Sequence, residues 1–249
     1  MRPVILSKRL RAVADMVTAG NSVCDVGCDH GFVPIYLVRQ GISPRVLAMD
    51  VRSGPLSAAK EHIAEHGLDS CIETRLSDGL HNYNIGEAQT LICAGMGGGL
   101  MMRILSDNAE KTASFHELIL QPQSEIEQFR AGLREMGYRI TDENMIEEDG
   151  KFYPMMKVIL DLCKPHKNID NGRDEKLCKL QDRYGAILLQ RKNQTLAVYL
   201  RREERIYREI LTALCAEGLE DVKRKRRYTE VSDLLEECRT ALRIVSTDA

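Results

Sequence analysis

The sequence predicts an α/β protein with a mostly parallel β-sheet, followed by an α-helical appendage. Two observations carry this prediction. Within the first 160 residues, short apolar runs alternate with amphipathic stretches, a pattern typical of buried parallel strands connected by helices. In the last third of the chain, apolar residues recur at intervals of three and four, which indicates helices packed along one face.

The individual elements follow from these runs and from turn residues. We expect parallel strands over Ser22–Val26, Val46–Val51, around Ile72–Leu76, Thr90–Ala94 and Glu117–Gln121. We expect helices over 32–40, 53–67, Leu100–Leu105 and Glu125–Met136. Two more strand-like runs, Tyr138–Glu147 and Phe152–Leu162, flank Asp149-Gly150, a dipeptide that favours hairpin turns. The first domain is therefore expected to end in an antiparallel hairpin.

A polar segment, Lys164–Arg173, contains Pro, Asn, Asp and Gly and is expected to be a linker. Beyond it, two helical patterns separated near Gly218 predict an antiparallel, coiled-coil-like hairpin. The domain prediction is thus 1–163 for the α/β domain and 164–249 for the helical domain. Packing of the two helices against each other is enough to explain their apolar stripes.

Composition narrows the functional classes. The net charge of −2 hides an asymmetry, because residues 1–163 carry 16 Lys and Arg against 22 Asp and Glu, whereas residues 164–249 carry 19 against 15. A basic appendage favours a polyanionic partner. No run of about 18 apolar residues occurs, which argues against a membrane span. The charged N-terminus and the cysteine spacing favour a cytoplasmic protein with reduced thiols and no obligatory metal.

The most specific motif is Asp25-Val26-Gly27-Cys28-Asp29-His30-Gly31, directly after the first predicted strand. A dinucleotide site would have G-x-G-x-x-G here, but Asp25 occupies the position of the first glycine. A carboxylate at this turn would repel a pyrophosphate. Asp25 and Asp29 instead favour a ligand with an ammonium and a sulfonium group, which describes S-adenosylmethionine. A structural turn without a ligand is the alternative.

Two further acidic residues follow the next strands. Asp50 ends the second apolar run, 19 residues after Gly31, where an acidic side chain can accept hydrogen bonds from both ribose hydroxyls. Asp78, in Ser77-Asp78-Gly79-Leu80, follows the third strand and is expected to bind the exocyclic amine of an adenine. The alternatives are an ordinary helix N-cap for Asp50 and an ordinary turn for Asp78.

A glycine-rich loop, Ala94-Gly95-Met96-Gly97-Gly98-Gly99, follows the fourth strand. It lacks the Lys-Ser/Thr of a P-loop and the spacing of the dinucleotide fingerprint. At the carboxyl end of this strand it would form the floor between a methyl donor and its target. A tight strand-to-helix turn is the alternative.

Together these residues resemble the bacterial tRNA (adenine-N1)-methyltransferases that act on adenine 22. The resemblance rests on Leu6–Leu10, Asp25–Gly31, Ala94–Gly98 and Leu120–Gln123, and it covers nearly the whole chain. It implies a class I methyltransferase fold, Rossmann-like with seven strands, and S-adenosylmethionine as cofactor. The residues then expected to bind the cofactor are Asp25, Gly27, Asp29, Gly31, Asp50, Asp78, Gly79, Ala94 and Gly95.

The resemblance also suggests a mechanism. The Asn/Asp-Pro-Pro motif by which other methyltransferases hold an exocyclic amine is replaced by Ala94–Gly98, which fits attack by a ring nitrogen. Neutral adenine N1 has an in-plane lone pair but becomes cationic after methylation, so a carboxylate is useful. We expect Asp29 to be catalytic, with His30 as second choice. Met96, Gly97, Gln121 and Gln123 are expected to contact a flipped base, and Tyr153 to stack on it.

Contacts with tRNA also require cations near phosphates. The candidates are Lys8, Arg9, Arg201, Arg205, Lys223, Arg224, Arg226 and Arg227. For the last six of these residues, the alternative interpretation is that they lie on solvated helix faces. Two other functions stay open at this point: methylation of another RNA or of a small molecule, and non-catalytic RNA binding on a methyltransferase scaffold.

Overall fold

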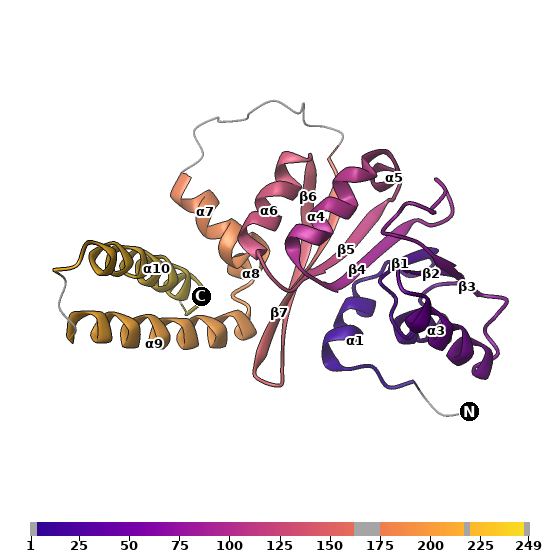
Figure 1. The fold of residues 1–249 in the computed structure, drawn as a ribbon, viewed down its shortest axis with the longest axis horizontal. Helices are drawn as coiled ribbons and strands as arrows, with labels where there is room; N and C mark the ends of the chain where they lie inside the picture. Colours follow the sequence, from indigo (N-terminus) through magenta and orange to yellow (C-terminus); the bar gives the residue numbers. More distant parts are fainter. Residues whose placement is uncertain (1–3, 162–174, 217–219, 247–249) are drawn as a thin grey trace. The chain divides into compact units, whose positions relative to one another are not determined.

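The computed structural model describes residues 4–161, 175–216 and 220–246 (Figure 1). The chain divides into two compact units, residues 1–169 and 170–249, and each is described by itself. The predicted boundary at 163/164, the predicted linker Lys164–Arg173 and the predicted turn near Gly218 lie outside the described residues.

The first unit is built on a seven-stranded sheet, as predicted. Its strands follow in spatial order β3-β2-β1-β4-β5-β7-β6, and the first five are parallel. The last two form the antiparallel hairpin, with β7 also antiparallel to β5. The bounds are β1 Val23–Val26, β2 Val46–Asp50, β3 Ile72–Leu76, β4 Thr90–Met96, β5 Glu117–Pro122, β6 Tyr138–Glu148 and β7 Lys151–Leu160.

Six helices accompany this sheet in the described part of the first unit. They are α1 Lys8–Asp15, α2 Phe32–Arg39, α3 Ser53–Glu65, α4 Gly98–Asp107, α5 Ala109–Ala113 and α6 Ile126–Glu135. Helices α1 and α5 were not expected. Helix α1 is short and charged, but the Ser7 hydroxyl caps it by accepting the Leu10 N–H at 3.3 Å. Burial of Ala12, Val13 and Ala14 against the sheet then stabilises it.

The core has two parts, one on each face of the sheet. Alternate residues of a strand point to opposite faces. On β4, Leu91 and Cys93 pack with residues of α4 and α6, whereas Ile92 packs with residues of α1, α2 and α3. Because helices cover both faces, the central strands are apolar along their length and leave polar groups for their ends.

The order of the strands determines where a ligand can bind. The chain proceeds from β1 to β2 and β3 in one direction, and then returns to place β4 on the other side of β1. In open α/β sheets such a reversal leaves a crevice outside the carboxyl ends of the strands. The motifs Asp25–Gly31 and Ala94–Gly99 follow the two strands at this reversal.

The second unit is helical, as predicted. Its described helices are α7 Glu175–Tyr184, α8 Ala186–Gln190, α9 Gln194–Ala216 and α10 Val222–Ser246. The two long helices lie side by side as a hairpin (Figure 1). Leu196 and Leu200 of α9 are buried, as are Val231, Leu235 and Cys238 of α10. The Cys238 thiol donates to the Leu200 carbonyl at 3.2 Å, so close packing explains the apolar stripes.

Candidate active site

The turn after β1 is held against the neighbouring strand. The N–H groups of Gly27 and Cys28 both donate to the Met49 carbonyl of β2, at 2.8 and 3.0 Å. Gly27 has a φ of +77°, which non-glycine residues rarely adopt, and an added Cβ would collide with the Met96 methyl group. This glycine therefore allows the loop after β4 to approach the loop after β1.

Asp50, the last residue of β2, ties two loops together. Its side chain is 5% exposed, and its two oxygens accept the Asp29 N–H at 3.2 Å and the Arg52 N–H at 2.9 Å. The Arg52 guanidinium lies 3.8 Å from the same carboxylate. A buried carboxylate that accepts two backbone N–H groups is held in a fixed orientation.

Asp25, the third residue of β1, has a different environment. It is buried, and burial together with the nearby Asp50 carboxylate raises the pKa of Asp25 to about 7. A carboxyl group in this state gains most from a cationic ligand, because the ligand replaces the solvation that burial removes. Such a group beside a cavity is typical of a binding or catalytic site.

Asp29 and His30 lie at the surface of the same turn. The Asp29 side chain is 61% exposed, and the backbone of Asp29 has a positive φ of 50°. Its Oδ1 lies 3.7 Å from His30 Nε2 and 3.9 Å from Arg52 Nη2. These distances are long for hydrogen bonds, so the Asp29 oxygens remain able to accept a new donor.

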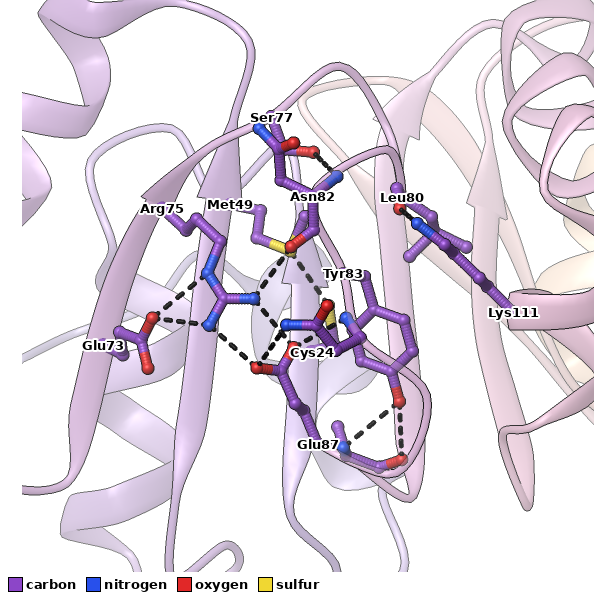
Figure 2. Close-up of polar contacts among 12 residues, drawn as sticks. Cys24, Met49, Glu73, Arg75, Ser77, Leu80, Asn82, Tyr83, Glu87 and Lys111 are labelled. Carbon is purple, nitrogen blue, oxygen red and sulfur yellow. Dashed lines mark hydrogen bonds and ion pairs between the residues drawn. The ribbon is translucent and has the colours of Figure 1, made fainter.

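The segment after β3 carries Ser77, Asp78 and Gly79 and is braced by polar contacts (Figure 2). The Ser77 hydroxyl donates to the Gly79 carbonyl at 2.9 Å and accepts the Asn82 N–H at 3.0 Å. Asp78 is exposed, while Ser77 and Gly79 are buried. The turn thus presents the Asp78 carboxylate to solvent on a backbone that its neighbours hold in place.

Two cations that do not line the cavity support this segment, and Figure 2 shows their contacts. Lys111 of α5 donates to the carbonyls of Leu80 and His81 at 3.0 and 2.6 Å. Arg75 of β3 binds Glu87 at 2.7 Å and the Asn82 carbonyl at 2.8 Å. The hydrogen bond from Arg75 lowers the pKa of Glu87 to about 2, which keeps this pair ionised at neutral pH.

The glycine-rich loop joins β4 to α4 and packs on the loop after β5. The Gly98 N–H donates to the Ser124 carbonyl at 3.2 Å, and the Gly99 N–H donates to the Glu125 carboxylate at 2.9 Å. An added Cβ at Gly98 would lie 2.5 Å from that Ser124 carbonyl. Bare backbone is therefore needed at Gly98 for packing against the loop after β5.

Arg9, Gln121 and Tyr153 meet although they are far apart in the sequence. Arg9 Nη1 donates to Gln121 Oε1 at 2.9 Å, and the Arg9 guanidinium carbon lies 5.4 Å from the centre of the Tyr153 ring. Gln121 is fully buried, and its Nε2 donates to the Pro122 carbonyl at 3.1 Å. The neighbouring Lys8 is exposed, and its backbone N–H donates to Glu148 at 2.6 Å.

These loops surround one cavity of about 550 Å³ at the carboxyl ends of the parallel strands. Among the predicted residues, those that line it are Arg9, Asp25, Gly27, Asp29, His30, Asp50, Asp78, Gly79, Ala94, Gly95, Met96 and Gln123. Five other predicted residues do not line the cavity, but lie next to the lining residues in the chain or contact them: Gly31, Lys8, Gly97, Gln121 and Tyr153.

Sequence reasoning missed several lining residues. These are Leu10, Phe32, Val33, Val51, Arg52, Ser77, Ile92, Leu100, Arg103 and Ile104, with Val26 and Cys28 of the recognised motif. Val51 is 59% exposed and Phe32 is 41% exposed, which is unusual for large apolar side chains. Val51 follows Asp50 directly, and this adjacency is the signal that could have identified it.

The predicted cations of the second unit differ in their surroundings. Arg201 and Lys223 are exposed, and neither has an ion-pair partner within residues 175–216 and 220–246. Arg205 lies 3.9 Å from Glu209, while Arg226 and Arg227 share Glu230 at 3.0 and 3.6 Å. The Arg224 N–H donates to Asp221 at 3.1 Å. Lys223 and Arg201 are therefore the most available for a phosphate.

Among the described helices, none combines the length and the apolar character that a membrane span requires. Across residues 4–161, 175–216 and 220–246, no group of three or more His, Cys, Asp and Glu side chains is arranged to hold a metal ion.

The fold and the carboxylate-lined cavity are those of a class I methyltransferase, and comparison with known proteins agrees. Residues 6–156 match the family model described as a methyltransferase domain, so the chain belongs to this family. It is 36% identical over 156 residues to the tRNA (adenine(22)-N(1))-methyltransferase of Bacillus subtilis. That alignment covers 63% of this chain and 66% of the relative, just under two thirds of the relative's length.

Solved structures extend the similarity to the second unit. The crystal structure of the B. subtilis m1A22 tRNA methyltransferase TrmK aligns with a TM-score of 0.80 at 28% identity, covering 96% of this chain and 100% of that one. A Streptococcus pneumoniae protein, described as a candidate tRNA (m1A22) methyltransferase and crystallised with S-adenosyl-L-methionine, gives the same values.

Proposed function

We propose that this protein is an S-adenosylmethionine-dependent methyltransferase that methylates N1 of adenine 22 in tRNA. The observation that carries the proposal is the cavity at the reversal of strand order, where Asp25, Asp29, Asp50 and Asp78 come from three successive strand ends. The similarity to the B. subtilis enzyme, over 156 residues in sequence and 96% of the chain in structure, supports the choice of substrate.

The residues present fit S-adenosylmethionine. A cavity of about 550 Å³ is within the range of small-molecule sites. Asp50 would bind the ribose hydroxyls and Asp78 the adenine amine. Asp25, whose pKa is raised to about 7, would bind a positive charge of the ligand. When bound, the cofactor supplies a methyl group on an electron-poor sulfonium.

The protein's own residues would align the two reactants and stabilise the charge that forms on the adenine. A flat base would lie against Ala94, Gly95 and Met96, which line the cavity with the β1 turn, and alignment of the two reactants supplies much of the rate. The adenine becomes cationic after methylation of N1. Asp29, exposed and only loosely paired with His30 and Arg52, would stabilise that charge and accept a proton from N6.

The helical unit would supply affinity for tRNA. The net charge of residues 164–249 is positive, and Arg201 and Lys223 are exposed and unpaired among the described residues. Phosphate contacts of this kind give sequence-independent affinity that depends on salt. Since tRNA is the substrate in this proposal, we infer that the protein acts in the cytoplasm.

The experiment that tests the proposal is mass analysis of nucleosides after incubation with S-adenosylmethionine and unmodified tRNA. We expect 1-methyladenosine from a tRNA with adenine at position 22, and none when that adenine is replaced by guanine. Methylation at another position would redirect the proposal to a different RNA site. Cofactor binding without methylation of any tRNA would favour a small-molecule substrate, and no cofactor binding at all would contradict the proposal.

A further inference from the structure

Arg9 projects from the first turn of α1 to the edge of the cavity. Its guanidinium covers the backbone of Gly95, because a Cβ added at Gly95 would lie 3.4 Å from Arg9 Nη1 and 3.7 Å from Gln123 Nε2. Arg9, Gly95 and Gln123 all line the cavity. A positive charge therefore faces the same space as the four aspartates.

The guanidinium is held in a defined orientation. One nitrogen donates to Gln121 Oε1 at 2.9 Å, and the buried Gln121 amide is itself oriented by its bond to the Pro122 carbonyl. The Tyr153 ring packs on the guanidinium at 5.4 Å. No carboxylate pairs with Arg9 within the part of the chain that the structure describes. Its remaining N–H donors are thus available to an anion.

The position of Arg9 along the cavity narrows the choice of anion. The strand order places the loops in the sequence Asp78, Asp50, Asp25–Gly31, Gly95 and Gln123 from one end to the other. If Asp78 and Asp50 bind the adenosine part of the cofactor, its amino-acid part extends toward Gly95. That part carries a carboxylate as well as an ammonium, and an ionised aspartate has no proton to donate to a carboxylate and repels it.

The other arginines of the cavity are less suited to this carboxylate. Arg52 lies 3.9 Å from Asp29 and 3.8 Å from Asp50, so a ligand carboxylate there would have to compete with these two side chains. Arg103 is exposed on α4. Its neighbour Ile104 lies beside Gly79, because a Cβ added at Gly79 would lie 3.1 Å from the Ile104 side chain. Arg103 is therefore at the end near Asp78, where the adenine is expected.

We propose that Arg9 binds the α-carboxylate of S-adenosylmethionine, and that Gln121 and Tyr153 are positioning residues for its guanidinium. This inference rests on the proposed function, because it concerns the same cofactor. It assigns to the cofactor three residues that sequence reasoning assigned to RNA. A planar guanidinium matches a carboxylate with two parallel hydrogen bonds, and prior orientation reduces the entropy lost on binding.

The test compares two ligands that differ only in this group. Isothermal titration of the full-length protein, without tRNA, measures affinity for S-adenosylmethionine and for decarboxylated S-adenosylmethionine, which keeps the ammonium and the sulfonium. We expect the wild-type protein to bind the decarboxylated ligand about 10- to 100-fold more weakly, as for the loss of a charged hydrogen-bonded pair. Arg9→Met should weaken S-adenosylmethionine by a similar factor and leave the decarboxylated ligand nearly unchanged.

The positioning residues are tested in the same way. Gln121→Leu should weaken S-adenosylmethionine about 3- to 10-fold in the wild-type background and have almost no effect in the Arg9→Met background, since its effect acts through Arg9. Gln121→Glu would pair Arg9 with a buried carboxylate and lose the bond to the Pro122 carbonyl, so it should also weaken S-adenosylmethionine. Arg11→Met is the matched control, because Arg11 is exposed on the same helix and does not line the cavity.

The outcomes separate this inference from the proposed function. Equal affinity of the wild-type protein for the two ligands would overturn the inference, whatever the variants do. Normal cofactor affinity in Arg9→Met with a raised KM for tRNA would also overturn it and return Arg9 to the RNA. Failure of the wild-type protein to bind S-adenosylmethionine would instead overturn the proposed function.

Discussion

At the scale of single residues, the cavity contains carboxylates in three different environments. Asp50 accepts two backbone N–H groups, whereas burial raises the pKa of Asp25 to about 7. Asp29 is exposed and has only distant cationic neighbours. These environments suit three different tasks: orienting a neutral ligand group, binding a cation, and handling charge during the reaction.

The raised pKa of Asp25 predicts a pH-dependent cofactor affinity. A cation binds the ionised carboxylate, so affinity should increase as pH rises from 6 to 8, with most of the change near pH 7, and by no more than about tenfold per pH unit. Titration calorimetry across this range measures it. Asp25→Asn should remove the pH dependence. His30→Gln, which changes another side chain of the cavity lining, should keep it. A pH dependence that persists in Asp25→Asn would show that a group other than Asp25 causes it.

The same shift has a consequence for stability without ligand. The folded-state pKa of Asp25 lies above the unfolded value of 3.8, so the folded protein retains the proton longer. Stability from this group is therefore present at low pH and is lost as pH rises through 7. At pH 8 we expect ligand-free Asp25→Asn to melt at a higher temperature than the wild-type protein. An equal or lower melting temperature would contradict the burial of a charged Asp25.

Removal of the Asp50 carboxylate should weaken cofactor binding at least tenfold. It would remove acceptors for the ribose hydroxyls and release the N–H groups of Asp29 and Arg52, each hydrogen bond to a charged group being worth roughly 1.5–3 kcal/mol. Calorimetry of Asp50→Ala measures the loss, with the exposed Asp69→Ala as control. Unchanged affinity in Asp50→Ala would exclude Asp50 from the site.

Asp29→Asn separates binding from turnover. The amide keeps the shape of the side chain but loses the charge, so we expect kcat to fall by about tenfold or more while cofactor affinity changes less. Single-turnover methylation at saturating cofactor, together with calorimetry, distinguishes the two effects. Collapse of cofactor binding with normal turnover at saturation would make Asp29 a binding residue only.

At the scale of elements, the site depends on the two short helices α1 and α5. Helix α5 contributes Lys111, whose ammonium binds the carbonyls of Leu80 and His81 just after Gly79 (Figure 2). Helix α1 is tied to β6 through the bond between the Lys8 N–H and Glu148. Short, polar helices of this kind are therefore part of what orients the binding residues.

Substitution of Lys111 tests this dependence. Lys111→Met keeps most of the side-chain volume but releases two carbonyls, so the segment around Asp78 and Gly79 should become more mobile. We expect about 3- to 10-fold weaker cofactor binding and faster amide exchange in residues 78–83. Lys60→Met, at an exposed position of α3, is the control and should change neither. Unchanged exchange in Lys111→Met would exclude Lys111 as a support of the loop.

At the scale of the whole molecule, the two compact units suggest a division of tasks. The residues that line the cavity all belong to the first unit, whereas the positive net charge is in the second. A protein truncated at Lys164 should fold and bind S-adenosylmethionine but lose most of its affinity for tRNA. Cofactor calorimetry and tRNA binding by the truncated protein measure both properties. An unchanged KM for tRNA would exclude the second unit as an RNA-binding part.

The salt dependence of tRNA binding tests individual cations of the second unit. Replacement of Lys223 by Ala should lower the slope of log affinity against log salt by roughly 0.7–0.9, the value for one phosphate contact. Arg226→Ala should have a smaller effect, because Arg226 is paired with Glu230 at 3.0 Å. Equal slopes for Lys223→Ala and the wild-type protein would show that Lys223 does not contact phosphate.

The sequence by itself was enough to predict the alternation of strands and helices and the helical appendage, because these depend on the local spacing of apolar residues. It also predicted Asp25, Asp50 and Gly95 at strand ends, since strand ends share one edge of a parallel sheet. The tertiary structure decided the contact of Arg9 with Gln121 and Tyr153, which no local pattern encodes because both residues lie more than a hundred positions from Arg9. It also decided the ionisation of Asp25, since a pKa depends on burial and on neighbours that only the folded chain brings together.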